Sequence, residues 1–566
     1  MLKYLTEQKG RFALTLAVSV LSVCGYVGWS FLLQVIVDIA TGKRSGSLVA
    51  LAGGLVLYMV VMDSVGALDR YLRPRLKWQA AGRARRALMA HALAMAPSAF
   101  AEVGVGAMVG KLTKQLDNVT TSFFTEWLWI FYVGTQLLVA TLATVSISPL
   151  VTGLIILMSI PSLVIPFLIK GMLNWASDAQ VAAIDAYTAK ATDLLSGFDT
   201  LKFALAGQRA AQQHARVDAA LVGAQTRNTR LEAISFGVST MLNDLTYMAA
   251  WFIGAVMVQR GQMDMGQMVV FSTLTGYLTF PMMSLTQDIP RLISGARAAR
   301  SLAAFIDAPL PPVAGTAQPQ AAAVLATLHH ASVTVDGQAV LTDLNLTWAP
   351  HDKVLVVGAS GSGKTTLIRL LLGELAPTSG DAYLLGAPAT ALARATVYQQ
   401  VGFLAQAGHI FTGTVRENLT LFAPVDTDEP LRAVMRRAGL DAWLAAHSLD
   451  TPVSDTSPVL SGGEKQRLAL ARLFLRGYAH YVFDELTTGL DPRIAAALQR
   501  DLFAMPQGFV MITHTYNAAA FAQADQIWVM AGGRIAAQGQ ATSPAVQAAL
   551  ARLELTAAVA QPEPAD

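Results

Sequence analysis

The stretch that decides the fold is Gly358-Ala359-Ser360-Gly361-Ser362-Gly363-Lys364-Thr365-Thr366. An apolar run, residues 354–357, precedes it and a leucine-rich run, residues 367–372, follows it, which is the order strand, glycine loop, helix. In such a loop the glycines let backbone amides turn toward phosphates, Lys364 supplies a cation to the outer phosphates, and the Thr365 hydroxyl can ligate Mg²⁺ at the helix N-terminus. The stretch therefore predicts an α/β domain of the P-loop class that binds ATP, with all nine residues as nucleotide contacts.

A second chemical element is the pair Asp484-Glu485, which ends the apolar stretch 481–483. We expect Asp484 to hold the magnesium shell and Glu485 to orient or polarise the attacking water. Acid pairs after apolar strands are common, so this pair indicates a nucleotide-hydrolysing site only in combination with the glycine loop.

The composition of the chain is that of a membrane protein rather than a soluble one. Of the 566 residues, 53% are hydrophobic and 14% are charged, whereas an ordinary globular chain is about 25% charged. The net charge of +3 is too small for a typical nucleic-acid-binding protein, so no nucleic-acid partner is expected. The single cysteine, Cys24, cannot form a disulfide within the chain. A lipid bilayer and a nucleotide are the partners that the composition and the loop predict.

Six apolar runs have about the length that a bilayer-crossing helix needs. The runs are residues 12–37, 48–62, 127–146, 150–169, 234–258 and 268–285. Lysine and arginine cluster before the first run, after the second and after the fourth, whereas the alternate loops contain few. The positive-inside bias therefore predicts that the N-terminus and the two long loops are cytoplasmic.

The two long loops, residues 80–116 and 176–227, are rich in alanine and charged residues and poor in proline, as long helices are. We predict an all-α membrane domain of six helices with long cytoplasmic helical extensions at residues 1–306. Residues 307–324, rich in proline and small residues, are the expected linker, and residues 325–556 the α/β nucleotide-binding domain. Residues 557–566 are expected to be a disordered tail.

Between the glycine loop and the acid pair lies Leu460-Ser461-Gly462-Gly463-Glu464, followed by Gln466-Arg467. This stretch resembles the signature of ATP-binding cassette (ABC) proteins, and the whole chain resembles an exporter-type half-transporter with a C-terminal cassette. The resemblance implies a dimer, either of two such chains or of this chain and a paralogue. In that dimer the glycine loop of one cassette and residues 461–464 of the other enclose each ATP.

The resemblance also implies roles for three residues outside these motifs. Gln406, which ends the stretch 401–406, corresponds to the glutamine that follows the next strand in the family, and is expected to act in hydrolysis and to reach Mg²⁺. His514, after residues 511–513, corresponds to the switch histidine and is expected to act in catalysis with Glu485. Asp491 belongs to the segment 489–491, which corresponds to the loop after the acid pair in the family, and is expected to contact the nucleotide.

Three positions depart from the family pattern. Val335 stands where the family has an aromatic ring that stacks on adenine, and Leu486 follows the acid pair where the family prefers Pro or Ala. The loop before the signature lacks the usual glycine and glutamate and has Asp455 in the acidic position. We expect these changes to affect nucleotide affinity and domain coupling but not the reaction, because all the hydrolytic residues are present.

Asp244, in the fifth apolar run, is the clearest ionisable residue within the predicted spans. An unpaired charge in hydrocarbon is costly, so Asp244 is a candidate for binding substrate in a water-filled cavity. The alternative is a structural residue that Asn243, Thr246 or a neighbouring helix caps by hydrogen bonds. Methionines 241, 248, 282 and 283 are candidates for lining an adaptable cavity, with ordinary packing as the alternative.

Together these features predict an ATP-hydrolysing transporter in a bacterial-type cell (inner) membrane, with its cassette in the cytoplasm. The expected activity is export of a small amphipathic, peptide, lipid or thiol-type solute by alternating access in a dimer. Two alternatives stay open, because a fold does not fix a function. One is an exporter-shaped importer of a metal chelate or similar solute, and the other is a non-transporting ATPase sensor that regulates a membrane partner.

Overall fold

The computed structural model describes residues 1–309, 317, 324–335, 337–405, 408–486, 491–513 and 518–553, with only the backbone described at residues 98, 162, 163, 165–167 and 170. The chain forms two compact units. Met1–Met95 and Phe100–Ala308 make up the helical unit, whereas Ala96–Ala99 and the chain from Pro309 onward belong to the α/β unit. The predicted tail and most of the predicted linker lie outside the described residues.

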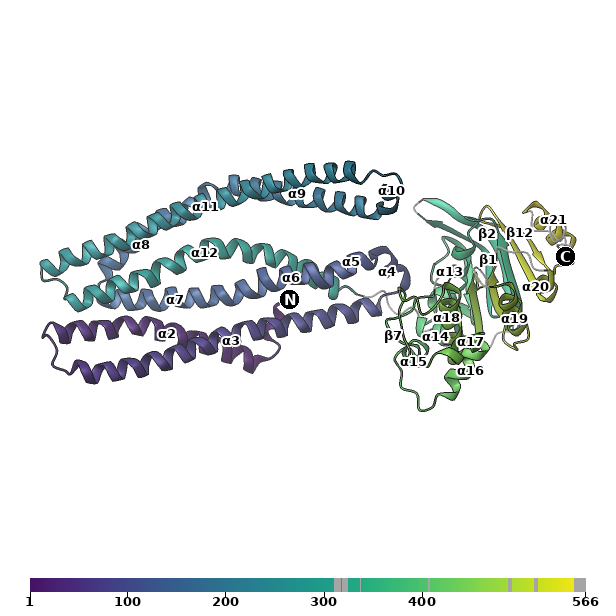
Figure 1. Cartoon of the computed structure of the whole chain (residues 1–566), viewed down its shortest axis with the longest axis horizontal. Coiled ribbons are helices and arrows are strands. Elements are labelled where there is room, and N and C mark those ends of the chain that lie inside the picture. The colour runs from purple at the N-terminus through teal and green to yellow at the C-terminus, as the bar shows by residue number, and fades with distance from the viewer. Residues whose placement is uncertain are drawn as a thin grey trace. The chain divides into compact units, whose positions relative to one another are not determined.

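Helices account for nearly all of the chain up to residue 306 (Figure 1). They are α1 (Leu2–Thr6), α2 (Lys9–Ala40), α3 (Leu48–Ala94), α4 (Pro97–Val103), α5 (Val105–Gly110), α6 (Leu116–Val119), α7 (Glu126–Ile147), α8 (Pro149–Leu168), α9 (Lys170–Ser196), α10 (Phe198–Phe203), α11 (Gly207–Gln259) and α12 (Met265–Ile306). Two π-helical segments, η1 (Lys111–Gln115) and η2 (Thr120–Thr125), join α5 to α6 and α6 to α7.

Five stretches within the described residues are long and apolar enough to cross a membrane: α2, α3, Val105–Ile147, α11 and α12. The sixth apolar helix is α8, whose shorter apolar part is Pro149–Pro161. Five of the six predicted runs fall within one of these helices, and the run 150–169 ends one residue beyond α8; the predicted extensions are mostly helical as well. The prediction of a helical membrane domain with long extensions is therefore confirmed.

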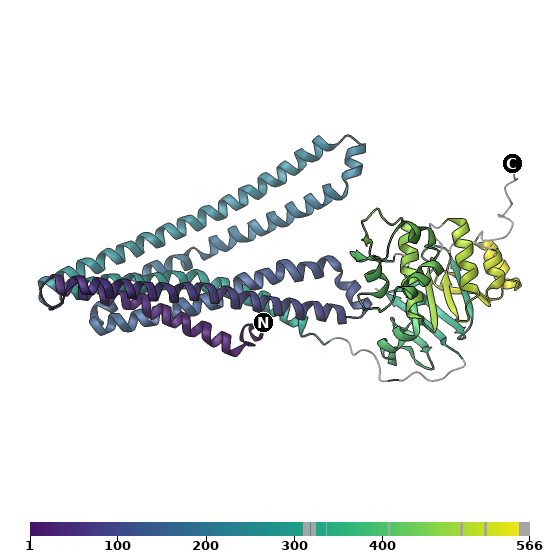
Figure 2. The same cartoon turned by 60° about the horizontal axis from the view of Figure 1, so that its bottom comes forward.

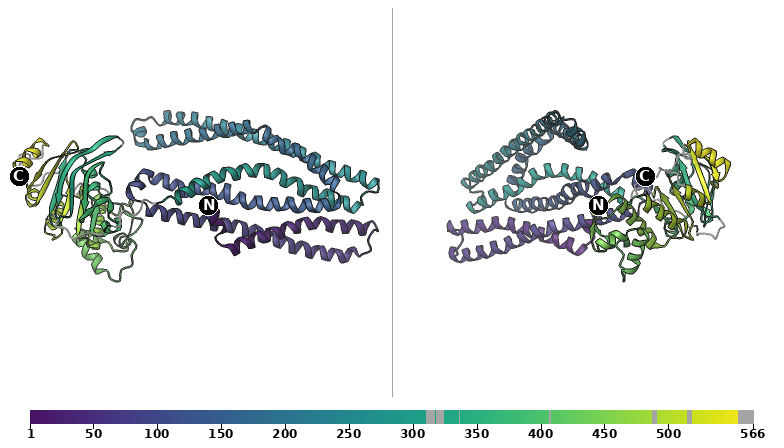
Figure 3. Two further views of the ribbon diagram at one scale, coloured as in Figure 1. Left: turned by 180° about the vertical axis from the view of Figure 1, so that it is seen from behind. Right: turned by 45° about the vertical axis from the view of Figure 1, so that its right-hand side comes forward.

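The helices of this unit pack both on neighbours along the chain and on helices far apart in sequence. Helix α2 packs on α3, α9 on α11, and α12 on both α7 and α2. The α2–α3 pair and the α9–α11 pair lie on opposite sides of the unit, and the α9–α11 pair diverges from the other helices toward α10 (Figures 2 and 3). Lys3 pairs with Asp307 at 2.8 Å, and Lys43 pairs with Asp264. The first ion pair joins α1 to the residue that follows α12, and the second joins the segment after α2 to the residue that precedes α12. The start of the chain and the end of α12 therefore lie at one end of the helical unit.

The α/β unit contains twelve strands in its described residues. They are β1 (Ala326–Val335), β2 (Gln338–Trp348), β3 (Lys353–Gly358), β4 (Ser379–Leu384), β5 (Ala387–Pro388), β6 (Val401–Leu404), β7 (Gly413–Thr414), β8 (Pro452–Val453), β9 (His480–Asp484), β10 (Phe509–Ile512), β11 (Gln526–Ala531) and β12 (Arg534–Gly539). The helices are α13 (Lys364–Leu371), α14 (Arg394–Gln400), α15 (Val415–Thr420), α16 (Glu429–Arg437), α17 (Asp441–Ala446), α18 (Gly462–Arg476), α19 (Pro492–Phe503), α20 (Ala518–Gln523) and α21 (Pro544–Arg552), with one 3₁₀ turn, η3 (Ala389–Ala391).

The central sheet has the strand order β12-β11-β3-β10-β9-β6, and all its pairings are parallel except that of β12 with β11. Successive side chains of β3 enter different cores: Val354 and Val356 pack beneath β1, β2 and α13, while Leu355 and Val357 pack against α18, α19 and α21. Both faces of the sheet are covered, which is why the strand sequence is apolar throughout. Parallel strands direct their carboxyl ends to one edge, so the loops after β3 and β9 emerge on the same side.

Candidate functional site

The loop between β3 and α13 has a backbone that only glycine allows at key positions. Gly361 and Gly363 have φ angles of +77° and +97°, in the left-handed region. A Cβ added to Gly358 would lie 2.5 Å from the carbonyl oxygen of Met530. The hydroxyl oxygen of Ser362 is buried and has no hydrogen-bond partner among the described residues. The loop thus offers a narrow cradle with an unsatisfied polar atom, which fits a phosphate chain.

Lys364 carries its charge inside this loop. Its side chain is buried, and Nζ donates hydrogen bonds to the carbonyl oxygens of Gly358 at 2.8 Å and Ala359 at 2.9 Å. Burial lowers the pKa of Lys364, and the charges of Glu485 and Asp484 oppose that shift. The two hydrogen bonds hold the ammonium group inside the glycine loop, and its contact with the outer phosphates stays a prediction.

The acid pair lies beside the loop because β10 separates β3 from β9 by a single strand. Ile512 of β10 stands opposite Val356 of β3 on one side and opposite Asp484 of β9 on the other. The Thr365 hydroxyl and a carboxylate oxygen of Asp484 are 3.5 Å apart. Hydroxyl and carboxylate oxygens are the hard ligands that Mg²⁺ prefers. The pair Thr365 and Asp484 therefore fits a magnesium ion bound with the nucleotide.

Glu485 has a left-handed backbone, with φ +57°, which is strained for a residue other than glycine. Its N–H donates to the carbonyl oxygen of Ile512 at 3.2 Å, and its carbonyl oxygen accepts a hydrogen bond from Gln466 Nε2 at 3.0 Å. Gln466 belongs to α18, the helix that begins with the signature stretch. The sequence shows Gln466 only as part of that stretch, and the structure adds that it positions the backbone of Glu485.

The signature stretch forms the start of α18. Ser461 is the N-cap, and its N–H and hydroxyl both donate to Glu464 Oε2 at 2.8 Å, while its hydroxyl accepts from the Glu464 N–H at 3.4 Å. Burial raises the pKa of Glu464, but the two hydrogen bonds from Ser461 outweigh it and leave the pKa lowered. A Cβ added to Gly462 would meet no atom within 4 Å. The first amides of α18, at Gly462 and Gly463, thus lie at an open helix start, where anions bind favourably.

The family resemblance also assigned roles in the nucleotide site to Asp491, Gln406 and His514. Asp491 is the N-cap of α19, and its carboxylate accepts a hydrogen bond from the Arg493 N–H at 2.9 Å. Gln406 and His514 lie outside the described residues, so their roles stay predictions.

Val335, at the predicted adenine-stacking position, ends β1 and is 44% exposed. Val333, two residues before it on β1, pairs with Leu341, and a Cβ on Gly363 of the glycine loop would lie 2.8 Å from the Leu341 side chain. His329 and His330, which precede Val335 on β1 and could supply a ring for adenine, each contact another side chain. His330 Nδ1 lies 2.6 Å from Asp343 Oδ1, and the His329 ring is edge-on to the Tyr383 ring.

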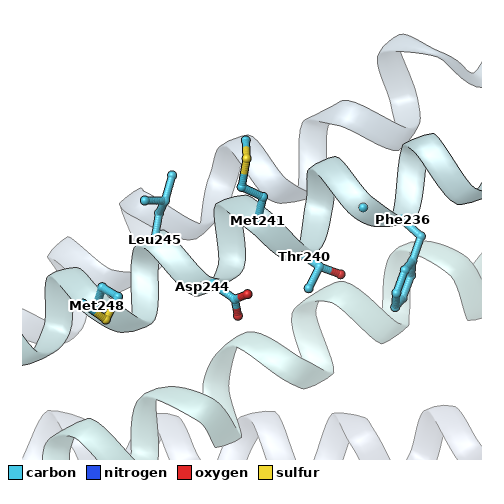
Figure 4. Close-up of a pocket in the computed structure, with 7 residues that line it drawn as sticks. Phe236, Thr240, Met241, Asp244, Leu245 and Met248 are labelled. Carbon is cyan, nitrogen blue, oxygen red and sulfur yellow. The ribbon is translucent and has the colours of Figure 1, made fainter.

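In the helical unit, Asp244 lines a hollow of about 440 Å³ on one face of α11 (Figure 4). The hollow is lined by Phe236, Gly237, Thr240, Met241, Asp244, Leu245 and Met248. The carboxylate of Asp244 points to the same side as Thr240 in Figure 4, and no hydrogen bond or ion pair reaches it from the described residues. The Thr246 hydroxyl donates instead to the carbonyl oxygens of Leu242 and Met158, so it does not cap Asp244.

A second cavity, of about 640 Å³, lies along α12 and includes Met282 in a mainly apolar lining that ends at Arg297. Two of the four methionines singled out in the sequence therefore line the hollow at Asp244, and a third lines this cavity.

Sequence reasoning missed a buried ionic network between α2, α3 and α7. Asp69 is 1% exposed, pairs with Arg73 at 2.6 Å and accepts a hydrogen bond from Ser19. The guanidinium of Arg73 lies 4.5 Å from the centre of the Tyr132 ring. The available signal was the Asp-to-Arg spacing of four residues, which places both side chains on one helix face.

Comparisons with known proteins agree with this geometry. The family model described as "ABC transporter transmembrane region" matches residues 12–282, and the model described as "ABC transporter" matches residues 341–488. The transport/processing ATP-binding protein ComA of Streptococcus pneumoniae is 24% identical over 553 residues, which cover 95% of this chain and 75% of ComA. The lactococcin transport/processing ATP-binding protein LcnC-like of Lactococcus lactis is 26% identical over 402 residues, 68% of this chain and 54% of that protein.

Among solved structures, a bacterial Atm1-family ABC exporter with ATP bound superimposes with a TM-score of 0.81 over 99% of both chains, at 21% identity, which shows a common fold. A transmembrane region followed by one ATP-binding cassette, together with the glycine loop, acid pair and signature helix, gives one conclusion: the chain belongs to the ABC transporter family and is a half-transporter.

Proposed function

We propose that this half-transporter hydrolyses ATP and exports an amphipathic solute as a dimer, from a bacterial inner membrane with its cassette in the cytoplasm. The observation that carries the ATPase proposal is the convergence of Lys364, Thr365 and the acid pair at one edge of the central sheet. In the described residues no hydrogen bond joins Ser461 to the glycine loop of the same chain, which supports a nucleotide site that a second chain completes.

Each residue has a distinct task in this proposal. Lys364 and the loop amides bind the outer phosphates, and Thr365 and Asp484 hold Mg²⁺, which neutralises charge on the phosphates. Glu485 polarises the attacking water, and Gln466 fixes the backbone that presents it. Ser461 with the amides of Gly462 and Gly463 binds the γ-phosphate from the opposite cassette. Gln406 and His514 are proposed to complete the hydrolytic site.

The proposed solute is small and amphipathic and carries a positive charge. The hollow at Asp244 combines apolar side chains such as Phe236 and Met248 with one carboxylate that lacks a partner in the described residues. A positively charged group is the ligand that compensates such a carboxylate at membrane depth. ComA and the lactococcin transporter are named as transport/processing proteins, and a peptide with a basic group fits this chemistry.

The experiment that tests the proposal compares the parent protein with Glu485→Gln in proteoliposomes whose cassettes face outward. The parent should accumulate a fluorescent amphipathic cation in the lumen when MgATP is added. Glu485→Gln should still bind ATP, while hydrolysis and accumulation fall together by about 10²- to 10⁴-fold, because the shape is kept and the general base is lost. Loss of solute from the lumen would instead indicate import, and ATP hydrolysis without solute movement would indicate a sensor.

A further inference from the structure

A groove with four arginines lies between the start of α2 and α3, in a part of the protein that the ATPase and transport proposals do not use. We call it the basic groove. It has a volume of about 510 Å³, and its lining consists of Gln8, Arg11, Arg75, Trp78, Gln79, Gly82, Arg83 and Arg86. This lining contains four positive charges and no carboxylate.

Most of this charge is not neutralised by the neighbouring side chains. Arg83 is engaged, because it donates to the Tyr4 carbonyl oxygen and pairs with Glu7 at 3.1 Å. The Arg11 guanidinium donates to the amide oxygens of Gln8 and Gln79, at 3.0 and 3.4 Å, and Arg75 lies over the Tyr71 ring. Arg86 is exposed and has no ion pair among the described residues. Three arginines therefore present positive charge that no carboxylate of the described chain pairs with.

An apolar groove continues from the basic groove along α2 and α3. It has a volume of about 210 Å³ and shares Arg11, Arg75 and Gln79 with the basic groove. The rest of its lining is Leu14, Thr15, Leu72 and Leu76, and the Leu14 side chain is 54% exposed. Leu14 and Thr15 follow Arg11 along α2, and Leu72 precedes Arg75 along α3, so this part of the apolar groove extends toward the membrane-crossing parts of both helices. Leu76 lies next to Arg75 on α3.

The basic groove lies at the end of the helical unit where the chain starts and where α12 ends, since Arg83 contacts Tyr4 and Lys3 pairs with Asp307. The chain continues from this end of α12 toward the nucleotide-binding unit, which needs cytoplasmic ATP, so we assign this end to the cytoplasmic face of the bilayer. Trp78, 55% exposed, lines the groove there, and tryptophan favours the membrane–water interface. Clusters of arginine at this interface attract the anionic lipids of the cytoplasmic leaflet.

We propose that the basic groove binds the phosphate headgroup of an anionic phospholipid from the cytoplasmic leaflet. Arg11, Arg75 and Arg86 hold the phosphate, and an acyl chain lies along Leu14, Leu72 and Leu76. A groove that is cationic at its cytoplasmic end and apolar toward the membrane matches a lipid better than a free anion, which would leave Leu14 exposed.

The test measures lipid binding to the full chain by native mass spectrometry from nanodiscs of phosphatidylcholine, with and without phosphatidylglycerol. The variants are Arg75→Gln and Arg86→Gln, and the matched control is Arg85→Gln, an exposed arginine next to Arg86 that does not line the groove. Each groove variant should weaken retention of phosphatidylglycerol about fivefold, and both together should multiply the effect. Arg85→Gln should bind as the parent does. Equal retention by Arg86→Gln and Arg85→Gln would overturn the proposal.

Two further measurements distinguish a bound lipid from a free anion and from a second copy of the chain. Inorganic phosphate and the deacylated headgroup glycerophosphoglycerol should fail to displace the lipid, and displacement by either at a similar concentration would show a site for free anions instead. The fraction of dimer, read in the same spectra, should be unchanged in Arg75→Gln and Arg86→Gln. If these variants lose dimer while phosphatidylglycerol retention stays at the parental level, the groove is a contact between copies of the chain and the lipid proposal is wrong.

Discussion

At the scale of single residues, the position of Lys364 leads to a direct prediction. Its ammonium is held between two loop carbonyls, so Lys364→Ala removes the cation without disturbing the strand or helix on either side. ATP binding and hydrolysis should both fall, by at least about tenfold, because residues 358–366 contain no other cationic side chain. Arg369→Ala, an exposed arginine on the same helix, is the control and should leave both unchanged. Hydrolysis at the parental rate by Lys364→Ala would refute the assignment of the loop.

Val335 gives a second prediction at this scale, because an aliphatic side chain cannot stack on adenine. Stacking is worth about 1 to 3 kcal/mol per base in nucleic-acid-binding proteins. Val335→Tyr should therefore lower the dissociation constant for ATP by about fivefold or more, as measured by fluorescence titration. Thr334→Tyr places the same ring on the opposite face of β1 and should have no such effect. An unchanged constant in Val335→Tyr would show that the base binds elsewhere.

At the scale of elements, Asn418 joins α15, α18 and the segment that follows Gln406. Asn418 is fully buried, its Nδ2 donates to the carbonyl oxygens of Phe411 and Thr414 at 2.8 and 3.0 Å, and its Oδ1 accepts from the Phe411 N–H at 2.9 Å. Arg472 of α18 donates to the carbonyl oxygen of Asn418 at 2.8 Å. These bonds fix the loop between the predicted catalytic glutamine and α15.

We predict that Asn418→Ala destabilises the cassette by about 2 to 3 kcal/mol, since it leaves buried backbone groups without partners. In the full chain the thermal unfolding midpoint of the cassette should fall, and ATP hydrolysis should fall with it. The control is Gln547→Ala on α21, an exposed amide for which neither change is expected. A midpoint equal to that of the parent would show that the loop does not depend on Asn418.

At the scale of the whole molecule, the depth of Asp244 in the membrane domain leads to a prediction about the stimulation of ATP hydrolysis by solutes. Helix α11 is continuous to Gln259, so Asp244 lies roughly 21 Å below the outer end of the apolar run at Val258. In a dimer, two such carboxylates would face one pathway. Asp244→Asn should leave basal ATP hydrolysis nearly unchanged and remove its stimulation by transported solutes, with the larger loss for cationic solutes. Asp218→Asn, on the same helix but outside the hollow, should keep the stimulation. Equal stimulation of Asp244→Asn and the parent by every transported compound would make Asp244 a structural residue.

The sequence by itself determined the features that depend on neighbours along the chain. The glycine loop is readable because Gly361 and Gly363 need left-handed backbone angles and Lys364 follows directly. The spans and long helices are readable because apolar length and helix-forming composition are local properties. The start of the signature helix can also be predicted from the sequence, because its capping box joins Ser461 and Glu464, which are three positions apart.

Only the tertiary structure decided which distant groups meet. The contact of Gln466 with Glu485, the burial of the Asp69–Arg73 pair beside Tyr132, and the basic groove each depend on packing between elements far apart in sequence. Arginines 11, 75 and 86 resemble ordinary positive-inside charges in the sequence, and only the packing of α2 on α3 brings them together in one groove. The physical reason is that hydrophobic length and backbone angles are set within a few residues, whereas ion pairs, positioning contacts and grooves are set by how helices and strands pack.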